Sequence, residues 1–336
     1  MVEARYYRKE GEKVQCQLCP HLCRIAEGET GICGVRSVRD GSLDADNYGV
    51  LAAVNWDPIE KKPLYHYYPG RPILSLGTYG CNLSCSFCQN WTLARSPVSL
   101  EAERAEPTDI LKLLHQEGGA NEVLGVAYTY NEPLIWFEFV LDTARLLKKN
   151  GYRNVLVTNG YINEKPLQEL LPFIDAMNID VKGFSDQFYQ KYCRGKREPV
   201  LRTVEAAVKS CHVEITCLLI PSLNDHPAEQ EALINWLSSL DPNIVLHYSR
   251  YFPRYKLDLP PTGEDILERT LLLAKKKLNY VYLGNIEIPG AGDTRCPLCG
   301  NLVVSRSGYR VKVVGLQGGN CNRCGKSVKI INGEPG

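Results

Sequence analysis

The chain has 336 residues, which is enough for one large domain with appendages or for two domains. Apolar residues make up 44% and charged residues 23% of it, as in an ordinary soluble globular protein. The 39 basic and 38 acidic residues give a net charge of +1. We therefore expect neither a membrane surface nor a nucleic acid as a partner.

The chain begins without a hydrophobic leader, and no apolar run reaches the length of a membrane span. We therefore expect a cytoplasmic protein. Its fourteen cysteines should be reduced in that compartment, where clustered cysteines usually bind metals.

The first cysteine group lies in a predicted N-terminal extension, residues 1–70. Cys16, Cys19, Cys23 and Cys33 have the spacing C-x2-C-x3-C-x9-C. A segment this short has no apolar core of its own, so a bound metal would have to order it. Four thiolates satisfy either zinc or a second iron-sulfur cluster, and both alternatives remain open from the sequence.

From residue 71 to residue 292 the pattern alternates between β-rich runs and amphipathic stretches. The predicted strands are 72–77, 123–130, 154–158, 176–181, 213–220, 244–248 and 280–283. The predicted helices are 107–116, 133–150, 164–171, 200–210, 227–240 and 263–278. This alternation predicts an α/β fold with a parallel sheet, either open or closed into a barrel, and a six-stranded or partial barrel fits the count.

A second cysteine group directly follows the first predicted strand of this region. Cys81, Cys85 and Cys88 have the spacing C-x3-C-x2-C, with no fourth cysteine nearby in the sequence. Three thiolates on a four-iron cluster leave one iron free to bind a substrate or cofactor. A zinc knuckle fits less well, because structural zinc takes four ligands in paired short spacings.

Polar residues lie at or just after the carboxyl ends of other predicted strands, and these ends of parallel strands meet at one edge. They are Glu132, Asn159, Asp180, Lys182 and His247. Each also has a structural interpretation: a helix-capping acid, a turn amide, a salt bridge and a satisfied core histidine. Cys193, in the loop after the fourth strand, is either an ordinary free thiol or a thiol that faces the substrate.

The last cysteine group lies in a predicted C-terminal module, residues 293–336. Cys296 and Cys299 form one C-x2-C-G knuckle, and Cys321 and Cys324 form another. This pattern predicts a zinc ribbon with a structural or docking role, because four thiolates leave no open position on the metal. Iron of the rubredoxin type is the chemical alternative.

Taken together, these motifs resemble a known enzyme family. The cysteine triad followed by Asn131-Glu132-Pro133, Thr158-Asn159-Gly160, Asp180-Val181-Lys182 and His247 resembles the pyruvate formate-lyase activating branch of the radical S-adenosylmethionine (radical SAM) enzymes. With the terminal cysteine groups, the resemblance extends over nearly the whole chain to the radical SAM proteins of the AmmeMemoRadiSam system. One departure is that the activases' Gly-Gly-Glu-Pro is Tyr-Asn-Glu-Pro here.

The resemblance implies a partial (β/α)6 TIM-type barrel, a [4Fe-4S] cluster and S-adenosylmethionine (SAM) as cofactor. It implies that Glu132 meets the methionine ammonium and that Asn159 helps to position the cofactor. Lys182 and His247 would lie near its carboxylate or ribose, with Asp180 close by.

The implied reaction is reductive cleavage of SAM to a 5′-deoxyadenosyl radical, which removes hydrogen from a partner protein or a small molecule. A low-potential electron donor, flavodoxin-like or ferredoxin-like, and a complex with other proteins of the system are implied as well. A non-catalytic electron-transfer or partner-binding protein is the alternative from another class.

Overall fold

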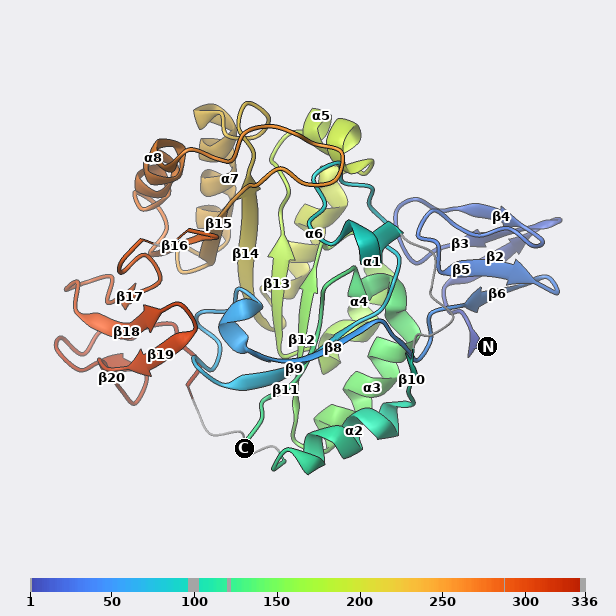
Figure 1. The fold of residues 1–336 in the computed structure, drawn as a ribbon, viewed down its shortest axis with the longest axis horizontal. Helices are drawn as coiled ribbons and strands as arrows, with labels where there is room; N and C mark the ends of the chain where they lie inside the picture. Colours follow the sequence, from blue (N-terminus) through green and yellow to red (C-terminus); the bar gives the residue numbers. More distant parts are fainter. Residues whose placement is uncertain (1, 96–102, 120–121, 287, 333–336) are drawn as a thin grey trace.

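The computed structural model describes residues 2–95, 103–119, 122–286 and 288–332. Its centre is a curved sheet of eight strands in the order β16-β15-β14-β13-β12-β11-β9-β8 (Figure 1). The strands are β8 (Ala53–Pro58), β9 (Pro72–Gly77), β11 (Gly125–Tyr128), β12 (Arg153–Thr158), β13 (Ala176–Asp180), β14 (His212–Leu219), β15 (Val245–Arg250) and β16 (Tyr280–Gly284). All neighbouring pairs are parallel except β8 with β9, so the predicted parallel α/β fold with a partial barrel is confirmed.

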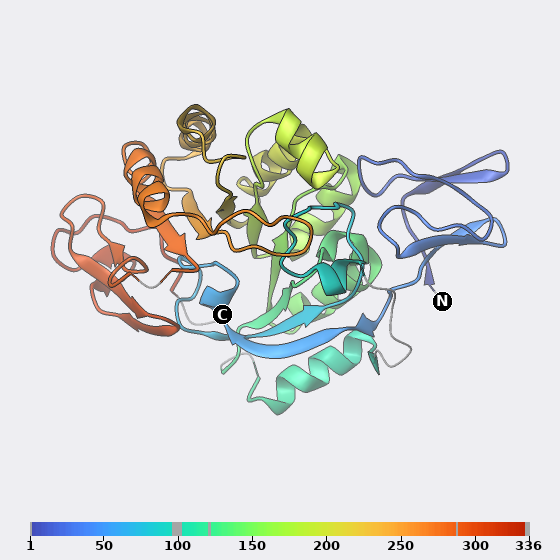
Figure 2. The same cartoon turned by 45° about the horizontal axis from the view of Figure 1, so that its top comes forward.

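Helices cover the outer face of this sheet (Figures 1 and 2). They are α2 (Pro107–Gln116), α3 (Phe137–Lys149), α4 (Glu164–Leu170), α6 (Arg197–Ala207), α7 (Pro227–Leu240) and α8 (Glu264–Ala274). The short helices are α1 (Trp91–Arg95), α5 (Asp186–Phe188) with the π-helix Tyr189–Cys193, and the 3-10 helices Ile59–Lys61, Pro133–Trp136 and Leu171–Phe173. In the described part of the chain, no helix is long and apolar enough to cross a membrane.

The inner parallel strands of the sheet are buried on both faces, which explains why they are apolar runs rather than alternating ones. All four residues of β11, for example, are buried. The helices begin and end close to the predicted positions. At the start of α2, Glu106 is the N-cap and forms a capping box with Asp109.

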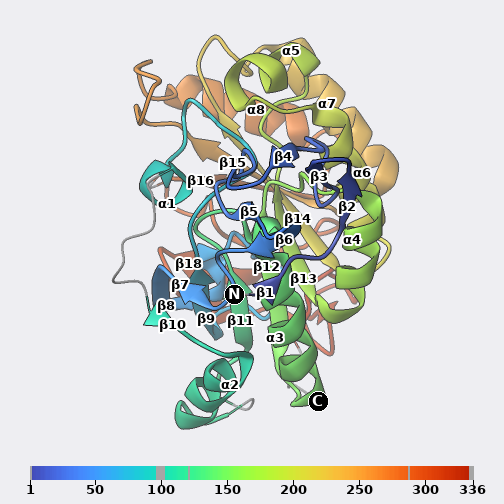
Figure 3. The same ribbon diagram turned by 90° about the vertical axis from the view of Figure 1, so that its right-hand side faces the viewer.

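The N-terminal strands form a separate module beside the barrel, seen in front of it in Figure 3. One three-stranded sheet contains β1 (Val2–Glu3), β6 (Ser42–Ala45) and β5 (Arg36–Arg39). Another contains β2 (Tyr7–Glu10), β3 (Lys13–Cys16) and β4 (Arg24–Ala26), while β7 (Val50–Leu51) pairs with β10 (Glu103–Arg104). β8 also precedes residue 70, yet it extends the main sheet rather than this module.

The C-terminal module lies on the opposite side of the barrel (Figure 1). It consists of β17 (Thr294–Arg295), β18 (Leu302–Ser307), β19 (Arg310–Val313), β20 (Leu316–Gln317) and β21 (Asn320–Cys321). Its Val303 and Val304 pack with Tyr280 and Tyr282 of β16 in one buried cluster. The module is therefore attached to the edge of the barrel through an apolar core.

Candidate active site

A cavity of about 260 Å³ opens at the carboxyl ends of the barrel strands. All three cysteines of the central motif line it, and so do residues that follow β11, β12 and β13. Those residues include Glu132, Asn159, Asp180 and Lys182. Four of the five residues predicted at strand ends therefore meet at one cavity with the cysteine triad.

The loop that carries the triad is fixed by backbone contacts with its surroundings. The amides of Ser84 and Ser86 donate to the carbonyls of Cys193 and Tyr192, both at 2.9 Å. Gly80 has φ of +84°, and a Cβ there would lie 2.5 Å from the carbonyl oxygen of Cys33. Only glycine permits this close approach, which holds the loop against the N-terminal module.

Glu132 lies at the start of a 3-10 helix and is 1% exposed. Its Oε1 accepts hydrogen bonds from Thr158 Oγ1 at 2.6 Å and from the Leu134 amide at 3.0 Å. Its Oε2 accepts one from the Asn159 amide at 2.8 Å. Burial raises the pKa of Glu132 to about 7, against the opposing effect of these hydrogen bonds. Among the described residues Oε2 has this single donor, so it has room to accept another from a ligand.

Asn159 links the carboxylate to the cysteine loop. Its Nδ2 donates to Asn82 Oδ1 at 2.9 Å and contacts Cys81 Sγ at 3.7 Å, and its Oδ1 accepts from the Tyr161 amide at 2.8 Å. A change at Asn159 would therefore disturb the position of both Glu132 and Cys81.

Asp180 and Lys182 form an ion pair at the cavity wall, with Nζ and Oδ2 2.6 Å apart. Burial works against the charge on Lys182, but the Asp180 carboxylate outweighs it, and the pKa of Lys182 is raised. Lys182 therefore presents a permanent positive charge to the cavity.

His247 lies elsewhere. Its Nε2 is 2.6 Å from Glu214 Oε2, its ring stacks on Tyr282, and it is not one of the residues that line the cavity. Ser249, two residues further along β15, lines the cavity on the same face. His247 thus occupies a deeper layer of the barrel interior than the sequence argument assumed.

Several cavity residues were missed by the sequence analysis. Asn131 Nδ2 donates to the Gly80 carbonyl at 2.9 Å, and Asn131 Oδ1 accepts from the Thr78 amide at 3.1 Å. Arg95, at the end of α1, lines the cavity with a buried Nη2 that has no hydrogen-bond partner in the described structure. Asn131 belongs to the Asn131-Glu132-Pro133 motif, in which the sequence analysis gave the asparagine no role, whereas no sequence signal identified Arg95.

Tyr130 occupies a position where the activases have glycine. Its φ is +71°, in the left-handed region that glycine adopts more easily. Its hydroxyl donates to Asp57 Oδ2 at 2.8 Å, and Lys62 Nζ lies 4.8 Å from its ring centroid. The larger side chain is therefore accommodated by contacts with the edge of the sheet.

Cys193 is fully buried, at the end of the π-helix behind the cluster loop. A hydrogen bond from its thiol lowers the pKa of Cys85, against the opposing effect of burial. Cys193 is therefore a neighbour of the cluster ligands.

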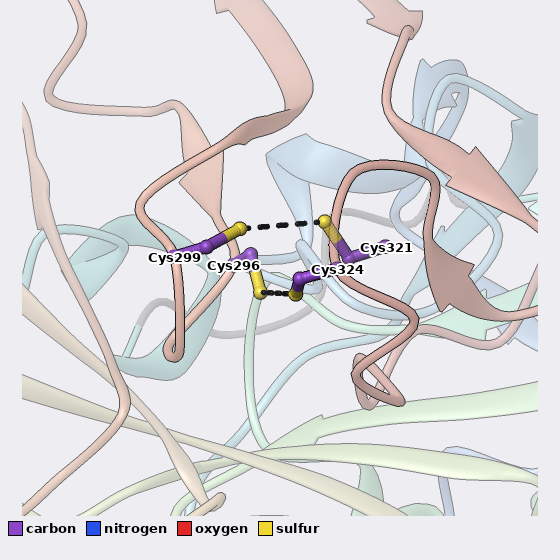
Figure 4. A group of neighbouring side chains, drawn as sticks. All are labelled: Cys296, Cys299, Cys321 and Cys324. Atoms are coloured by element: carbon purple, nitrogen blue, oxygen red, sulfur yellow. Dashed lines mark hydrogen bonds between the residues drawn. The ribbon is translucent and has the colours of Figure 1, made fainter.

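The C-terminal cysteines form a compact group of four (Figure 4). Cys296 and Cys324 have sulfurs 3.6 Å apart, and Cys299 and Cys321 have sulfurs 3.7 Å apart. All four sulfurs lie within 4.8 Å of one another. A single tetrahedral ion with metal-sulfur distances of about 2.3 Å requires such spacing. The group therefore fits one metal ion, as a zinc-ribbon-like module requires.

The N-terminal cysteines also meet in space. Cys16, Cys19, Cys23 and Cys33 line one small apolar cavity next to the cluster loop. The structure thus brings the four cysteines of the N-terminal group to one cavity, and their role as metal ligands stays a prediction.

Comparison with known proteins identifies the central site. A model of the radical SAM superfamily matches residues 75–233, which include the cysteine triad, Glu132, Asn159 and Lys182. An uncharacterized protein of Methanocaldococcus jannaschii is 40% identical over 339 residues, covering 98% of this chain and 100% of that protein. The chain belongs to the radical SAM superfamily.

More distant relatives share part of the barrel. Pyruvate formate-lyase 1-activating enzyme of Escherichia coli is 28% identical over 153 residues, which are 44% of this chain and 60% of that enzyme. The crystal structure of a radical SAM methyltransferase from Sphaerobacter thermophilus has a TM-score of 0.51 at 15% identity, covering 70% of this chain and 71% of that one. The latter likeness concerns the fold alone.

The cavity fits the cofactors that this superfamily implies, a [4Fe-4S] cluster and SAM. Three cysteines on one wall leave one iron of such a cluster open. The free acceptor position of Glu132 and the unpartnered nitrogen of Arg95 suit the amino and carboxylate groups of a methionine moiety. The chain is therefore an enzyme of the radical SAM type.

Proposed function

We propose that this protein cleaves SAM reductively and uses the resulting radical to remove a hydrogen atom from a partner protein. The observation that carries the proposal is the single cavity shared by Cys81, Cys85, Cys88, Glu132 and Lys182. When bound, the cluster and SAM supply one electron and a 5′-deoxyadenosyl group, which is chemistry that no side chain provides.

The chain's own residues bind and orient the cofactor in this proposal. Glu132 Oε2 accepts a hydrogen bond from the SAM amino group, and Asn159 holds Glu132 in place. Lys182 and Arg95 provide positive charge for the SAM carboxylate, and Asp180 keeps Lys182 charged. His247 orients Glu214 below the cavity and makes no direct contact with the cofactor in our proposal.

Two observations support a partner protein as the substrate. Pyruvate formate-lyase 1-activating enzyme, whose name states that it activates another protein, is similar to this chain over 153 residues. Phe252 and Tyr255 are exposed aromatic side chains in the segment that Gln89, a cavity residue, contacts through the Phe252 carbonyl at 3.5 Å. The ring centroids of Tyr255 and Trp91 lie 5.3 Å apart in a stacked arrangement. We further propose a flavodoxin-like or ferredoxin-like electron donor and, from the sequence motifs, membership in the AmmeMemoRadiSam system.

Anaerobic incubation of the reconstituted protein with dithionite and SAM tests the cleavage step. We expect 5′-deoxyadenosine from the wild type and none from a Cys81→Ala, Cys85→Ala, Cys88→Ala variant. A wild type that carries a full cluster, binds SAM and yields no product with either dithionite or a flavodoxin would contradict the proposal. Addition of candidate partner proteins and small molecules then shows which of them raises the yield.

We also propose that the C-terminal metal is zinc and that its role is structural. The close sulfur spacing supports a mononuclear ion, and all four ligand positions are taken by cysteine. Elemental analysis separates zinc from iron of the rubredoxin type.

A further inference from the structure

The N-terminal cysteines differ from the C-terminal ones in how their sulfurs are spaced. Among the described residues, which include all four N-terminal cysteines, Cys296, Cys299, Cys321 and Cys324 are the one group whose donor atoms all lie within 4.8 Å. Neither the four N-terminal cysteines nor the three of the central motif form such a compact group among the described residues, although each set lines one cavity. A cluster of several irons holds its thiolates further apart than a single ion does, because the metal atoms lie between them.

A buried guanidinium also faces the N-terminal cavity. Arg36 lines the cavity and is 1% exposed. Its Nη2 donates to Glu138 Oε2 at 2.6 Å, whereas its Nε has no partner in the described structure. A buried N–H without a partner is costly, and the sulfurs of an iron-sulfur cluster accept such hydrogen bonds. The Nε–H of Arg36 is therefore available to donate a hydrogen bond to a ligand bound in this cavity.

The N-terminal cavity adjoins the central cluster loop directly. The amide of Cys81 donates to the carbonyl of Cys33 at 3.3 Å, so one hydrogen bond joins a ligand residue of each site. His21 Nε2 contacts the Asn82 carbonyl at 2.7 Å, and Asn82 lines the N-terminal cavity while it contacts Asn159 in the central site. No other pair of cysteine groups in the described chain shares such a hydrogen bond.

We infer that Cys16, Cys19, Cys23 and Cys33 bind a second iron-sulfur cluster, which passes electrons to the central one. An external donor of the flavodoxin or ferredoxin class loses one electron, the N-terminal cluster gains it, and the central cluster then takes it. The relay role rests on the proposed function, whereas the metal site does not. At about 10 Å³ the cavity admits a cluster only if residues 27–33, the mostly exposed segment that follows β4 and lines the cavity with Gly31 and Ile32, move outward.

Metal analysis of the anaerobically reconstituted full chain tests the site. We expect about eight irons and one zinc per wild-type chain. The Cys81→Ala, Cys85→Ala, Cys88→Ala variant should keep about four irons, with a reduced-cluster EPR signal that SAM does not change. A Cys19→Ser, Cys23→Ser variant should also keep about four irons, with a signal that SAM does change.

A Cys211→Ser, Cys217→Ser variant is the control for loss of cysteine as such, and circular dichroism reports whether each variant folds. A folded central-triad variant that contains about two zinc and no iron would overturn the cluster assignment, even if the wild type cleaves SAM. Conversely, iron in that variant would support the second cluster even if the wild type fails to cleave SAM.

The relay is tested by the rate at which reduced flavodoxin reduces the central cluster, followed by stopped-flow absorbance. We expect the Cys19→Ser, Cys23→Ser variant to lose most of this rate while it still binds SAM. An unchanged rate in that variant would overturn the relay role. The assignment of a second cluster would then be judged by the metal analysis.

Discussion

Replacement of Glu132 by glutamine isolates the contact on which the proposed SAM site depends. The carboxylate is 1% exposed, and Oε2 has one donor, the Asn159 amide at 2.8 Å. A hydrogen bond to a charged group contributes about 1.5–3 kcal/mol. Since every 1.4 kcal/mol is tenfold in affinity, we expect SAM to bind about 10- to 150-fold more weakly to the variant.

The substitution should also lower stability. Oε1 accepts two hydrogen bonds, so the glutamine amide nitrogen would replace Oε2 and face the Asn159 amide, donor against donor. An unsatisfied buried donor costs about 1–3 kcal/mol. Denaturant unfolding of the loaded protein should show a loss of this size.

Isothermal titration calorimetry of SAM, under anaerobic conditions with the cluster intact, measures the affinity. Glu229→Gln is the matched control, because Glu229 accepts from the Phe184 amide at 2.6 Å but does not line the cavity. The control should lose stability and keep its SAM affinity. Equal SAM affinity in Glu132→Gln and the wild type would refute the assigned role of Glu132.

Three further predictions concern residues around the site. Cys193→Ala removes a hydrogen bond to Cys85, so the potential of the central cluster should become more negative while its iron content stays unchanged, as a redox titration followed by EPR will show. Between pH 7 and pH 5 the wild type should lose about 2 kcal/mol more stability than His66→Gln: burial lowers the pKa of His66 from 6.5 to about 3, so only the unfolded chain binds a proton there. Cys299→Ser should remove about one zinc per chain and lower the thermal midpoint without loss of iron.

Each of these predictions has a control. Cys217→Ala removes a buried cysteine that does not line the cavity and should leave the cluster potential unchanged. His115→Gln, at an exposed histidine of α2, should keep the wild-type pH dependence. Cys211→Ser should keep its zinc. A variant that matches its control contradicts the corresponding prediction.

Sequence reasoning located the sheet and most of the cavity because both depend on local patterns. Parallel strands buried on two faces are apolar runs, and residues directly after them must meet at one edge. Glu132, Asn159 and Lys182 follow such runs, Asp180 ends one, and all four line the cavity. The spacing of the cysteine triad needed no tertiary information at all.

The depth at which a residue lies in the barrel, and the packing of segments between the strands, could not be predicted in this way. Alternation places His247 and Ser249 on one face but does not tell which of them reaches the cavity, because the tilt and curvature of the barrel decide that. Arg95 ends the five-residue helix α1 and Cys193 ends the five-residue π-helix, and helices this short carry no periodic signal in the sequence. The hydrogen bond from the Cys81 amide to the Cys33 carbonyl joins two loops far apart in the sequence, so it could not be predicted from the sequence either.

The interior below the cavity explains why the C-terminal module is part of the fold. Glu214, fully buried in β14, accepts from the amides of Tyr65 and His66 and from the rings of His212 and His247. Burial alone would raise the pKa of Glu214, but the hydrogen bonds from the two histidine rings hold it well below its ordinary value.

His66 connects this carboxylate to the C-terminal module. Its Nδ1 contacts the Lys329 carbonyl and its Nε2 the Tyr282 hydroxyl, both at 2.7 Å. A chain that ended before residue 293 would lack the Lys329 carbonyl, so the buried Nδ1 of His66 would lose its partner, at a cost of about 1–3 kcal/mol. The zinc-ribbon-like module therefore stabilises the interior of the barrel on which the SAM cavity rests, whereas the N-terminal module contacts the cluster loop itself.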